Sequence, residues 1–442
     1  MTAVAERTRP ERLKRMLATT PDNLIEYIVS RRLWGEEDLC LLDVGASGGI
    51  HQRWAVFGDR LTAVGFDPLI SEVDRLNKAE KRPTVRYESA FVGCDEYDRL
   101  FPPEIRNDAR RSRYNQPFER SSAVAACRIL QRDFVQAVFN SGAPVEFTTR
   151  TVTLDQFLAS SPHLRPDFLK IDTDGSDFQV LLGAATLLES PTLLGISIES
   201  QFHGAVHDYA NVFSNIDRFL RQRGFTLFDL NACKYSRAEL PAPFAISKPA
   251  QTVSGQVQWG DALYFRDLGQ PLYEAQFGVK PTRERLLKLC CLFESHGLSD
   301  CAAEILITSE MLESLPERTV LLDLLTPRLF GDTQYDQYMA RFNANPSAWL
   351  PRNLRRILQR APVVASIAPQ PAPGASGVTP AGAATTDRDE REASLRRENA
   401  ELRELVSAQS TRIRKLKEQR SVLRERLERR ERRLEDLKSA KK

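Results

Sequence analysis

A glycine-rich loop with two nearby acidic residues carries the strongest chemical signal in this sequence. The stretch 41–50 reads LLDVGASGGI, so Asp43 stands two residues before Gly45 at the end of an apolar run. Glycines at such a turn let backbone N–H groups come close to a ligand. A second acidic residue, Asp67, ends the next apolar run in VGFDP, 22 residues after Gly45. This pair of carboxylates beside a glycine loop is typical of a site for a ligand that carries a ribose.

Three ligand or reaction types compete for this loop. The dinucleotide pattern GxGxxG fits poorly, because Ser47 replaces its second glycine and no glycine follows at the third position. GASGG also matches the GxSxG elbow of serine hydrolases, but that elbow normally follows several strands, and this loop follows the first evident one. The third type is S-adenosylmethionine, whose ammonium group Asp43 would receive and whose ribose hydroxyls Asp67 would hold. A plain tight turn with a surface acid remains the structural alternative.

We therefore expect S-adenosylmethionine as the cofactor. The residues predicted to bind it are Asp43, Gly45, Ser47, Gly49, Asp67 and Ala90. His51, at the start of the following helix, either touches the cofactor or packs locally.

Three residues further along are the candidates for catalysis. Asp172, in the sequence KIDTDG, ends an apolar run that should border the crevice at the carboxyl edge of a sheet, although it could also cap the helix near Ser176. Glu199 ends the next run, in ISIES. His203 follows it and could take a proton near neutral pH, although a lone histidine is more often structural. A hydroxyl acceptor needs such a group to accept its proton.

A divalent cation is a weaker possibility at the same edge. The carboxylates of Asp172, Asp174, Asp177 and Glu199 offer the oxygen ligands that Mg²⁺ prefers. Acidic residues at a strand-to-helix junction serve equally well as helix N-terminal charges. We predict no metal site.

The elements that position these residues follow a strand–helix alternation over residues 38–268. Such a rhythm predicts an α/β domain with a mainly parallel sheet buried on both faces. Residues 95–140 break the rhythm and are rich in Arg, Asp and Asn, so we expect an insertion or lid there. The expected strands are Leu39–Val44, Leu61–Phe66, Phe168–Ile171, Leu193–Ile198, Thr226–Leu230 and Ala262–Phe265.

Helices are expected on both sides of this domain. Residues 1–37 show helical spacing of apolar residues and form a predicted N-terminal helical segment. Residues 269–360 show no strand rhythm and predict a small helical domain. Within it we expect a hairpin turned at His296-Gly297 and another helix from Thr319 to Leu329.

The C-terminal part differs from everything before it. Residues 361–386 include eight alanines and five prolines and contain no charged residue. This composition predicts a linker. Residues 387–442 repeat apolar residues in heptads between Leu395 and Leu437, which predicts a coiled coil. Asn399 at an a position favours a parallel dimer, so we expect a homodimer through residues 395–437. A lone charged helix, or a different partner protein, is the alternative.

Composition limits the class of protein. The chain has 442 residues, 42% hydrophobic and 27% charged, and no run of about 18 apolar residues that would predict a transmembrane segment. Seven cysteines without a CxxC pair, and no apolar leader, favour a cytoplasmic protein with reduced thiols. Residues 387–442 have a net charge of +6 and the rest −3, so the body is not expected to bind nucleic acid specifically.

Several of these motifs together resemble the FkbM-type methyltransferases. LLDVGASGG and VGFDP are similar to the family's first two motifs, and TLDQFL followed by PDFLKIDTDGSDFQVLLGA is similar to its central block. The resemblance covers residues 38–267. It implies a Rossmann-like class I methyltransferase sheet with helices on both faces and S-adenosylmethionine as cofactor. It also implies methylation of a hydroxyl oxygen on a glycan, secondary metabolite or other small-molecule acceptor.

Two features depart from the family pattern. Asp177 stands where the family usually has Glu, and segment 95–140 is longer and more charged than expected. Both departures concern the substrate pocket more than the cofactor site. A function of a different class also stays open. In that alternative the α/β domain is a non-catalytic docking module, and the protein works through its coiled coil and helical domain.

Overall fold

A computed structural model describes the central part of the chain. The described residues are 23–94, 146–173, 175–203, 207–236, 242–243, 245, 251–327, 331 and 334–350. Outside them lie the first 22 residues, Asp174 and three predicted features: the insertion at 95–140, the linker at 361–386 and the coiled coil at 387–442. Within the described helices, none is long and apolar enough to cross a membrane.

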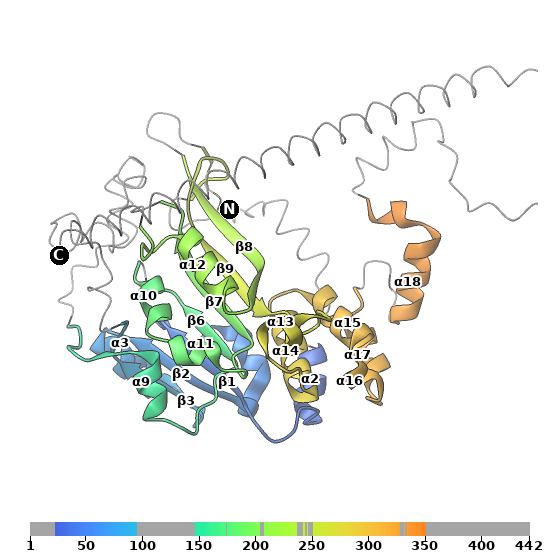
Figure 1. Cartoon of the computed structure of the whole chain (residues 1–442), viewed down its shortest axis with the longest axis horizontal. Helices are drawn as coiled ribbons and strands as arrows, with labels where there is room; N and C mark the ends of the chain where they lie inside the picture. The colour runs from blue at the N-terminus through green and yellow to red at the C-terminus, as the bar shows by residue number, and fades with distance from the viewer. Residues whose placement is uncertain are drawn as a thin grey trace, which may run out of the picture. The chain divides into compact units, whose positions relative to one another are not determined.

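A seven-stranded sheet forms the centre of the described part, with the spatial order β3-β2-β1-β6-β7-β9-β8 (Figure 1). Its strands are β1 Leu39–Val44, β2 Leu61–Asp67, β3 Val85–Ser89, β6 Phe168–Ile171, β7 Gly195–Gln201, β8 Phe225–Tyr235 and β9 Gln256–Arg266. Neighbours pair in parallel, except that β9 runs antiparallel to both β7 and β8. The chain moves outward from β1 to β3 and then returns to the other side of β1. That switch of direction leaves a crevice at the carboxyl ends of β1 and β6.

The apolar runs predicted this sheet well. Two predicted strands, Leu39–Val44 and Phe168–Ile171, coincide with β1 and β6. The strand β3 was not predicted, because only Val85 and Tyr87 in VRYES are buried and apolar at this sheet edge. A separate parallel pair joins β4 (Phe91–Val92) to β5 (Thr151–Val152).

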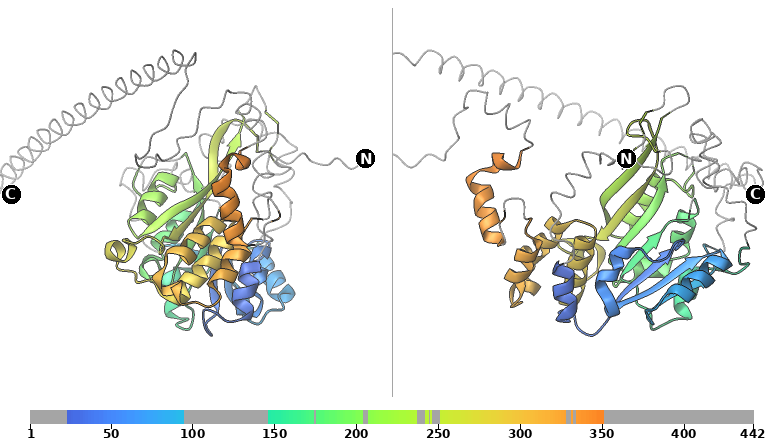
Figure 2. Two further views of the ribbon diagram at one scale, coloured as in Figure 1. Left: turned by 90° about the vertical axis from the view of Figure 1, so that its right-hand side faces the viewer. Right: turned by 180° about the vertical axis from the view of Figure 1, so that it is seen from behind.

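Helices cover both faces of the sheet, as a doubly wound fold requires. One face packs against α9 Leu154–Ala159, α10 Asp177–Leu182, α11 Ala185–Glu189 and α12 Phe213–Arg221. The other face packs against α2 Asn23–Ser30, the 3₁₀ segment η1 Gln52–Arg60, α3 Ile70–Ala79 and α14 Arg283–Ser295. Figure 2 shows the sheet and these helices from two further sides. Side-chain alternation explains the division, because Leu41 faces the second set whereas Leu42 faces the first.

The remaining helices follow β9 in the chain. They are α13 Tyr273–Phe277, α15 Ser299–Thr308, α16 Glu310–Glu313, α17 Arg318–Leu325, α18 Tyr335–Ala344 and the 3₁₀ segment η4 Pro346–Trp349. The predicted turn at His296-Gly297 separates α14 from α15. The predicted helix to Leu329 ends earlier, at Leu325, because Thr326 precedes a proline and is extended.

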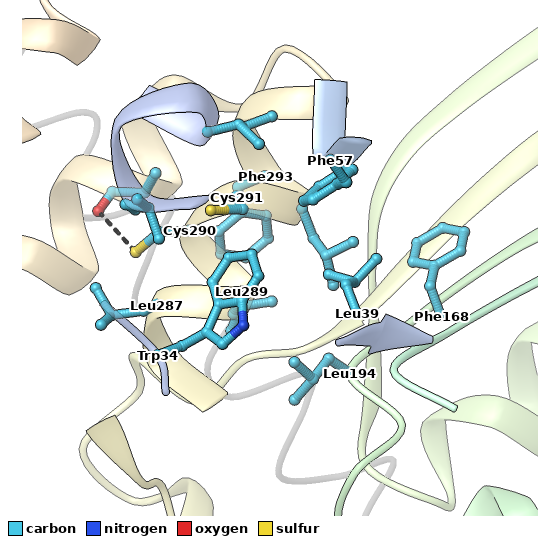
Figure 3. Close-up of a cluster of buried hydrophobic side chains, with 14 of the residues drawn as sticks. Trp34, Leu39, Phe57, Phe168, Leu194, Leu287, Leu289, Cys290, Cys291 and Phe293 are labelled. Carbon is cyan, nitrogen blue, oxygen red and sulfur yellow. Dashed lines mark hydrogen bonds between the residues drawn. The ribbon is translucent and has the colours of Figure 1, made fainter. Parts of the chain in front are cut away.

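The expected helical domain at 269–360 does not have a core of its own. Leu287, Cys291 and Phe293 of α14 belong to the same buried cluster as Leu39 of β1 and Phe168 of β6. Figure 3 shows these α14 side chains beside the strand residues. The described residues between 23 and 350 accordingly belong to one compact unit. The helices after β9 therefore share a core with the sheet, because the apolar residues of α14 are buried against it.

Candidate functional site

A cavity of about 720 Å³ lies at the carboxyl ends of β1, β2 and β6. Of the six residues predicted to bind the cofactor, four line it: Gly45, Ser47, Asp67 and Ala90. The predicted catalytic residue Asp172 lines it as well. Residues from separate predicted motifs therefore meet at one hollow, at the switch point where open α/β sheets bind ligands.

The glycine at position 45 is required by a close approach between two strand ends. A Cβ atom on Gly45 would lie 1.8 Å from the backbone oxygen of Asp172, and its φ of +82° is in the left-handed region. Gly45 N and Ala46 N both donate to Phe66 O at 2.9 Å, and Asp172 N donates to Val44 O at 2.9 Å. The loop is thus fixed against both neighbouring strands before any ligand arrives.

Asp67 ends β2 at the cavity wall. Its Oδ1 accepts a hydrogen bond from Leu69 N at 2.8 Å, which orients the carboxylate. Burial raises the pKa of Asp67, and the hydrogen bond from Leu69 partly offsets that effect. The carboxylate has a second oxygen, so Asp67 can accept hydrogen bonds from ligand hydroxyls.

Asp43 does not line the cavity. It is buried at the end of β1, and its Oδ1 lies 3.1 Å from Lys170 Nζ on the neighbouring strand β6. Burial raises the pKa of Asp43 to about 6, although the ammonium of Lys170 opposes the rise. Lys170 Nζ also donates to Gly45 O at 2.9 Å and lies 3.4 Å from Asp172 Oδ2. Asp43 is therefore placed behind the loop, where it contacts Lys170.

Gly49 and His51 also lie outside the lining. A Cβ on Gly49 would come within 3.0 Å of Leu76 and 3.2 Å of the Tyr87 hydroxyl, so this glycine packs the loop against α3 and β3. His51 Nδ1 accepts from Arg53 N at 3.1 Å and caps η1. Both residues thus make local packing contacts in this structure.

Of the three predicted catalytic residues, one lines the cavity. The Asp172 side chain is 46% exposed and borders the cavity. Glu199, near the end of β7, pairs in register with Asp261 of β9 and is buried. His203 Nε2 lies 2.7 Å from Val257 O, at the start of β9, and outside the lining. Only Asp172 therefore faces the cavity.

A polar row that the sequence did not reveal crosses the sheet beside Asp172. Asp261 is in register with Glu199 on β7 and with Asn231 on β8, so all three share one face. Desolvation and then the negative charge of Asp172 raise the pKa of Asp261 to about 6, even though the residue reaches the surface. Arg53 adds a positive charge nearby. Strand pairing created this row, because its members come from three separate segments.

Two aromatic residues at the cavity were also missed. Phe91 and Phe147 both line it, with exposed fractions of 44% and 53% and ring centroids 6.2 Å apart. Exposed aromatic faces at a cavity are suited to stacking against a planar ring. The signal in the sequence was weak, because Phe147 follows the long segment that breaks the strand rhythm.

The alternative chemistries find less support in this geometry. Asp177 is fully buried, and its carboxylate accepts from Thr173 N, Gly175 N and the Asn211 amide. It therefore stabilises a loop and does not face the cavity. Among the described residues, no group of three or more acidic, histidine or cysteine side chains could hold a metal ion.

The hydrolase alternative requires a histidine beside Ser47. Ser47 lines the cavity, but the rings of His51 and His203 bond Arg53 N and Val257 O instead. The GxSxG match therefore lacks its base at these two positions.

Residues 43–227 match the family model described as the methyltransferase FkbM domain. The matched region begins at Asp43, includes Asp67 and Asp172, and ends at the start of β8. No curated protein matches the chain.

Several solved structures are similar to the chain at low identity. Precorrin-6y C5,15-methyltransferase from Geobacter metallireducens GS-15 is 9% identical over 55% of this chain and 87% of that chain, with a TM-score of 0.25. A TehB-like SAM-dependent methyltransferase from Corynebacterium glutamicum is 10% identical over 58% of this chain and 94% of that chain, with a TM-score of 0.22. A SAM dependent methyltransferase from Aquifex aeolicus is 10% identical over 59% of this chain and 100% of that chain, with a TM-score of 0.23. At such TM-scores these likenesses carry no weight, so the fold assignment rests on strand order and on the family match.

Proposed function

We propose that the chain is a methyltransferase that binds S-adenosylmethionine in the cavity of about 720 Å³, because residues 43–227 match the family model described as the methyltransferase FkbM domain. The observation that carries the proposal is the meeting of Gly45, Ser47, Asp67 and Asp172 at that one cavity. Its volume falls within the usual range for small-molecule sites, about 300–1,000 Å³.

The residues present fit this cofactor in type and position. Asp67 is the partner proposed for the ribose hydroxyls, and Phe91 with Phe147 offers aromatic surface to the adenine ring. Gly45 has no side chain between the loop and Asp172, so the loop can lie close to the ligand. Bound S-adenosylmethionine would supply an electrophilic methyl group.

Asp172 is the group we propose to accept a proton from the acceptor hydroxyl. Its carboxylate borders the cavity, and Lys170 Nζ, 3.4 Å away, holds it in place. A proton acceptor in position contributes about 10²–10⁴-fold to such a reaction. Glu199 and His203 remain the alternative bases.

The acceptor we propose is a hydroxyl group on a glycan or small molecule. The polar row of Asp261, Glu199 and Asn231 beside Asp172 supports a ligand rich in hydroxyl groups, because carboxylates and amides bond such groups readily. We also propose that the chain acts as a homodimer through residues 395–437, on the strength of the heptads alone.

Titration calorimetry with S-adenosylmethionine tests the cofactor assignment. Asp67→Ala should weaken binding by about 10-fold to 150-fold, because a charge-assisted hydrogen bond contributes about 1.5–3 kcal/mol. Asp74→Ala is the matched control, since Asp74 is exposed on α3 and outside the cavity lining. If wild-type protein gave neither heat nor a thermal shift, the docking-module alternative would be preferred.

Transfer of a labelled methyl group from S-adenosylmethionine to a panel of neutral and anionic glycans tests the acceptor. Asp172→Asn should bind the cofactor normally and lose about 10²–10⁴-fold in turnover on any acceptor found. Near-normal turnover in this variant would move the role of base to Glu199 or His203.

A further inference from the structure

Lys170 makes contacts that join two parts of the proposed site. Its Nζ donates to Gly45 O at 2.9 Å and lies 3.1 Å from Asp43 Oδ1 and 3.4 Å from Asp172 Oδ2. One ammonium group thus bridges the glycine loop, the buried acid behind it and the acid that borders the cavity. Among the described lysines, Lys170 is the one that donates a hydrogen bond to the loop.

We propose that Lys170 is a positioning residue, which holds the glycine loop and Asp172 in their ligand-binding arrangement only while Asp43 is ionised. This inference rests on the proposed binding of S-adenosylmethionine at the cavity. It assigns Asp43 a role that differs from the sequence expectation. Asp43 anchors the ammonium of Lys170 from behind and does not meet the ammonium of the ligand.

The arrangement makes cofactor binding sensitive to pH. Burial raises the pKa of Asp43 to about 6, so this carboxylate becomes protonated within an accessible pH range. A protonated Asp43 no longer pairs with Lys170, and the contact that fixes Gly45 O weakens. The affinity for S-adenosylmethionine should therefore fall as the pH drops through about 6.

Other charged groups also lie around Lys170. Asp172 lies on the open side, Asp67 and Asp261 contribute at longer range, and His51 of η1 is a neighbour whose pKa is lowered mainly by burial. Burial opposes the charged form of Lys170, but Asp43 and Asp172 outweigh it and raise the pKa of Lys170. The lysine thus stays charged across the tested range. Asp43 and Asp261 both have a pKa of about 6, and Asp43 is the one that contacts Lys170.

The experiment is titration calorimetry of the full-length protein with S-adenosylmethionine from pH 5 to pH 8. Lys170→Met should weaken binding by about 10-fold to 100-fold near pH 7.5, because a charged hydrogen-bond donor to the loop is lost. The fall in affinity on acidification should be absent or much smaller in this variant, because Asp43 can no longer act on the loop through the ammonium of Lys170. Lys170→Arg keeps the positive charge. Its affinity for S-adenosylmethionine should therefore fall near the same pH as in the wild type.

Two further variants separate positioning from simple stability. Lys288→Met removes the other buried lysine near β6 and should lower the melting temperature without moving the pH profile of binding. Asp43→Asn cannot ionise, so the fall in affinity near pH 6 should disappear, and this variant carries the test if Lys170→Met does not fold. The amino group of the ligand titrates equally in all variants.

The two proposals fail in different ways. If wild-type protein did not bind S-adenosylmethionine at any pH, the proposed function would be overturned, and this inference with it. If the wild type bound S-adenosylmethionine, but Lys170→Met or Asp43→Asn kept both the wild-type affinity and its fall on acidification, only the positioning role would be overturned.

Discussion

Strand β6 has a lysine–aspartate group at each end, and the two groups differ in how they meet solvent. At the amino end, Lys288 Nζ of α14 lies 3.1 and 3.2 Å from the two oxygens of Asp167, and both side chains are only 4% exposed. At the carboxyl end, Lys170 is 27% exposed and contacts Asp43 and the half-exposed Asp172. The same pair of residue types therefore occurs in a sealed and in an open setting.

Closure by a helix accounts for the difference. Lys288 also donates to Asp38 O at 3.1 Å, and Cys40 N donates to Asp167 at 2.8 Å, so this group fastens α14 to the start of β1 and β6. At the other end, the chain leaves a cavity where the sheet changes direction. The buried pair of Lys288 and Asp167 thus stabilises the attachment of α14 to the sheet. The more open group around Lys170, at the other end of β6, can respond to a ligand.

The largest effect is expected from Lys288→Met. Removing one partner of a buried ion pair leaves an uncompensated charge and costs about 3–5 kcal/mol in the free energy of unfolding. Chemical denaturation at pH 8 measures it, with Lys280→Met as a control at an exposed position just before α14. A loss no larger than that of the control would contradict the idea that this pair fastens the helix.

Gly45→Ala should come next. The new Cβ would lie 1.8 Å from Asp172 O, so the loop and strand must separate, and we expect a loss of about 2–4 kcal/mol together with loss of S-adenosylmethionine binding. Gly48→Ala is the matched control. Its φ of +81° carries the same backbone strain, but nothing lies within 4 Å of its Cβ position. Equal losses in both variants would show that φ, and not the approach to Asp172, governs the position.

A smaller effect is the pH dependence of the Lys288→Met deficit, which is the free energy of unfolding that this variant loses relative to the wild type. Burial raises the pKa of Asp167 from 3.8 to about 6 in the folded state, so its contribution to stability is full below pH 3.8 and is lost as the pH rises through 6. Without Lys288 the folded-state pKa rises further, and more stability is lost above pH 6. The deficit should therefore be smaller at pH 5 than at pH 8, by on the order of 1–3 kcal/mol. Denaturation of both proteins at the two pH values measures it, and a deficit independent of pH would rule out Asp167 as the cause.

Truncation after Leu358 should have the smallest effect on both lysine groups, because both lie within the compact unit of the described residues between 23 and 350. Stability and affinity for S-adenosylmethionine should stay within about 0.5 kcal/mol of the full chain. Light scattering should show a change from dimer to monomer. The same oligomeric state in both proteins would mean that residues 395–437 recruit a different partner.

The glycine loop, the second acid and the strand rhythm were readable in the sequence because each depends on neighbours in the chain. LLDVGASGG gave both the strand β1 and the turn after it, and VGFDP gave the end of β2 with Asp67 on the cavity wall. The heptads after residue 387 likewise predict a coiled coil from local spacing alone, although this region lies outside the described residues.

Tertiary structure alone decided which charged residues met. Asp43 was predicted to bind the ligand, and the sequence could not show that strand pairing places Lys170 directly beside it. Lys288 reaches Asp167 across 121 positions of sequence, which also joins the expected helical domain to the sheet. Spacing along a chain specifies local conformation, whereas the partner of a buried charge is set by which strands and helices pack together.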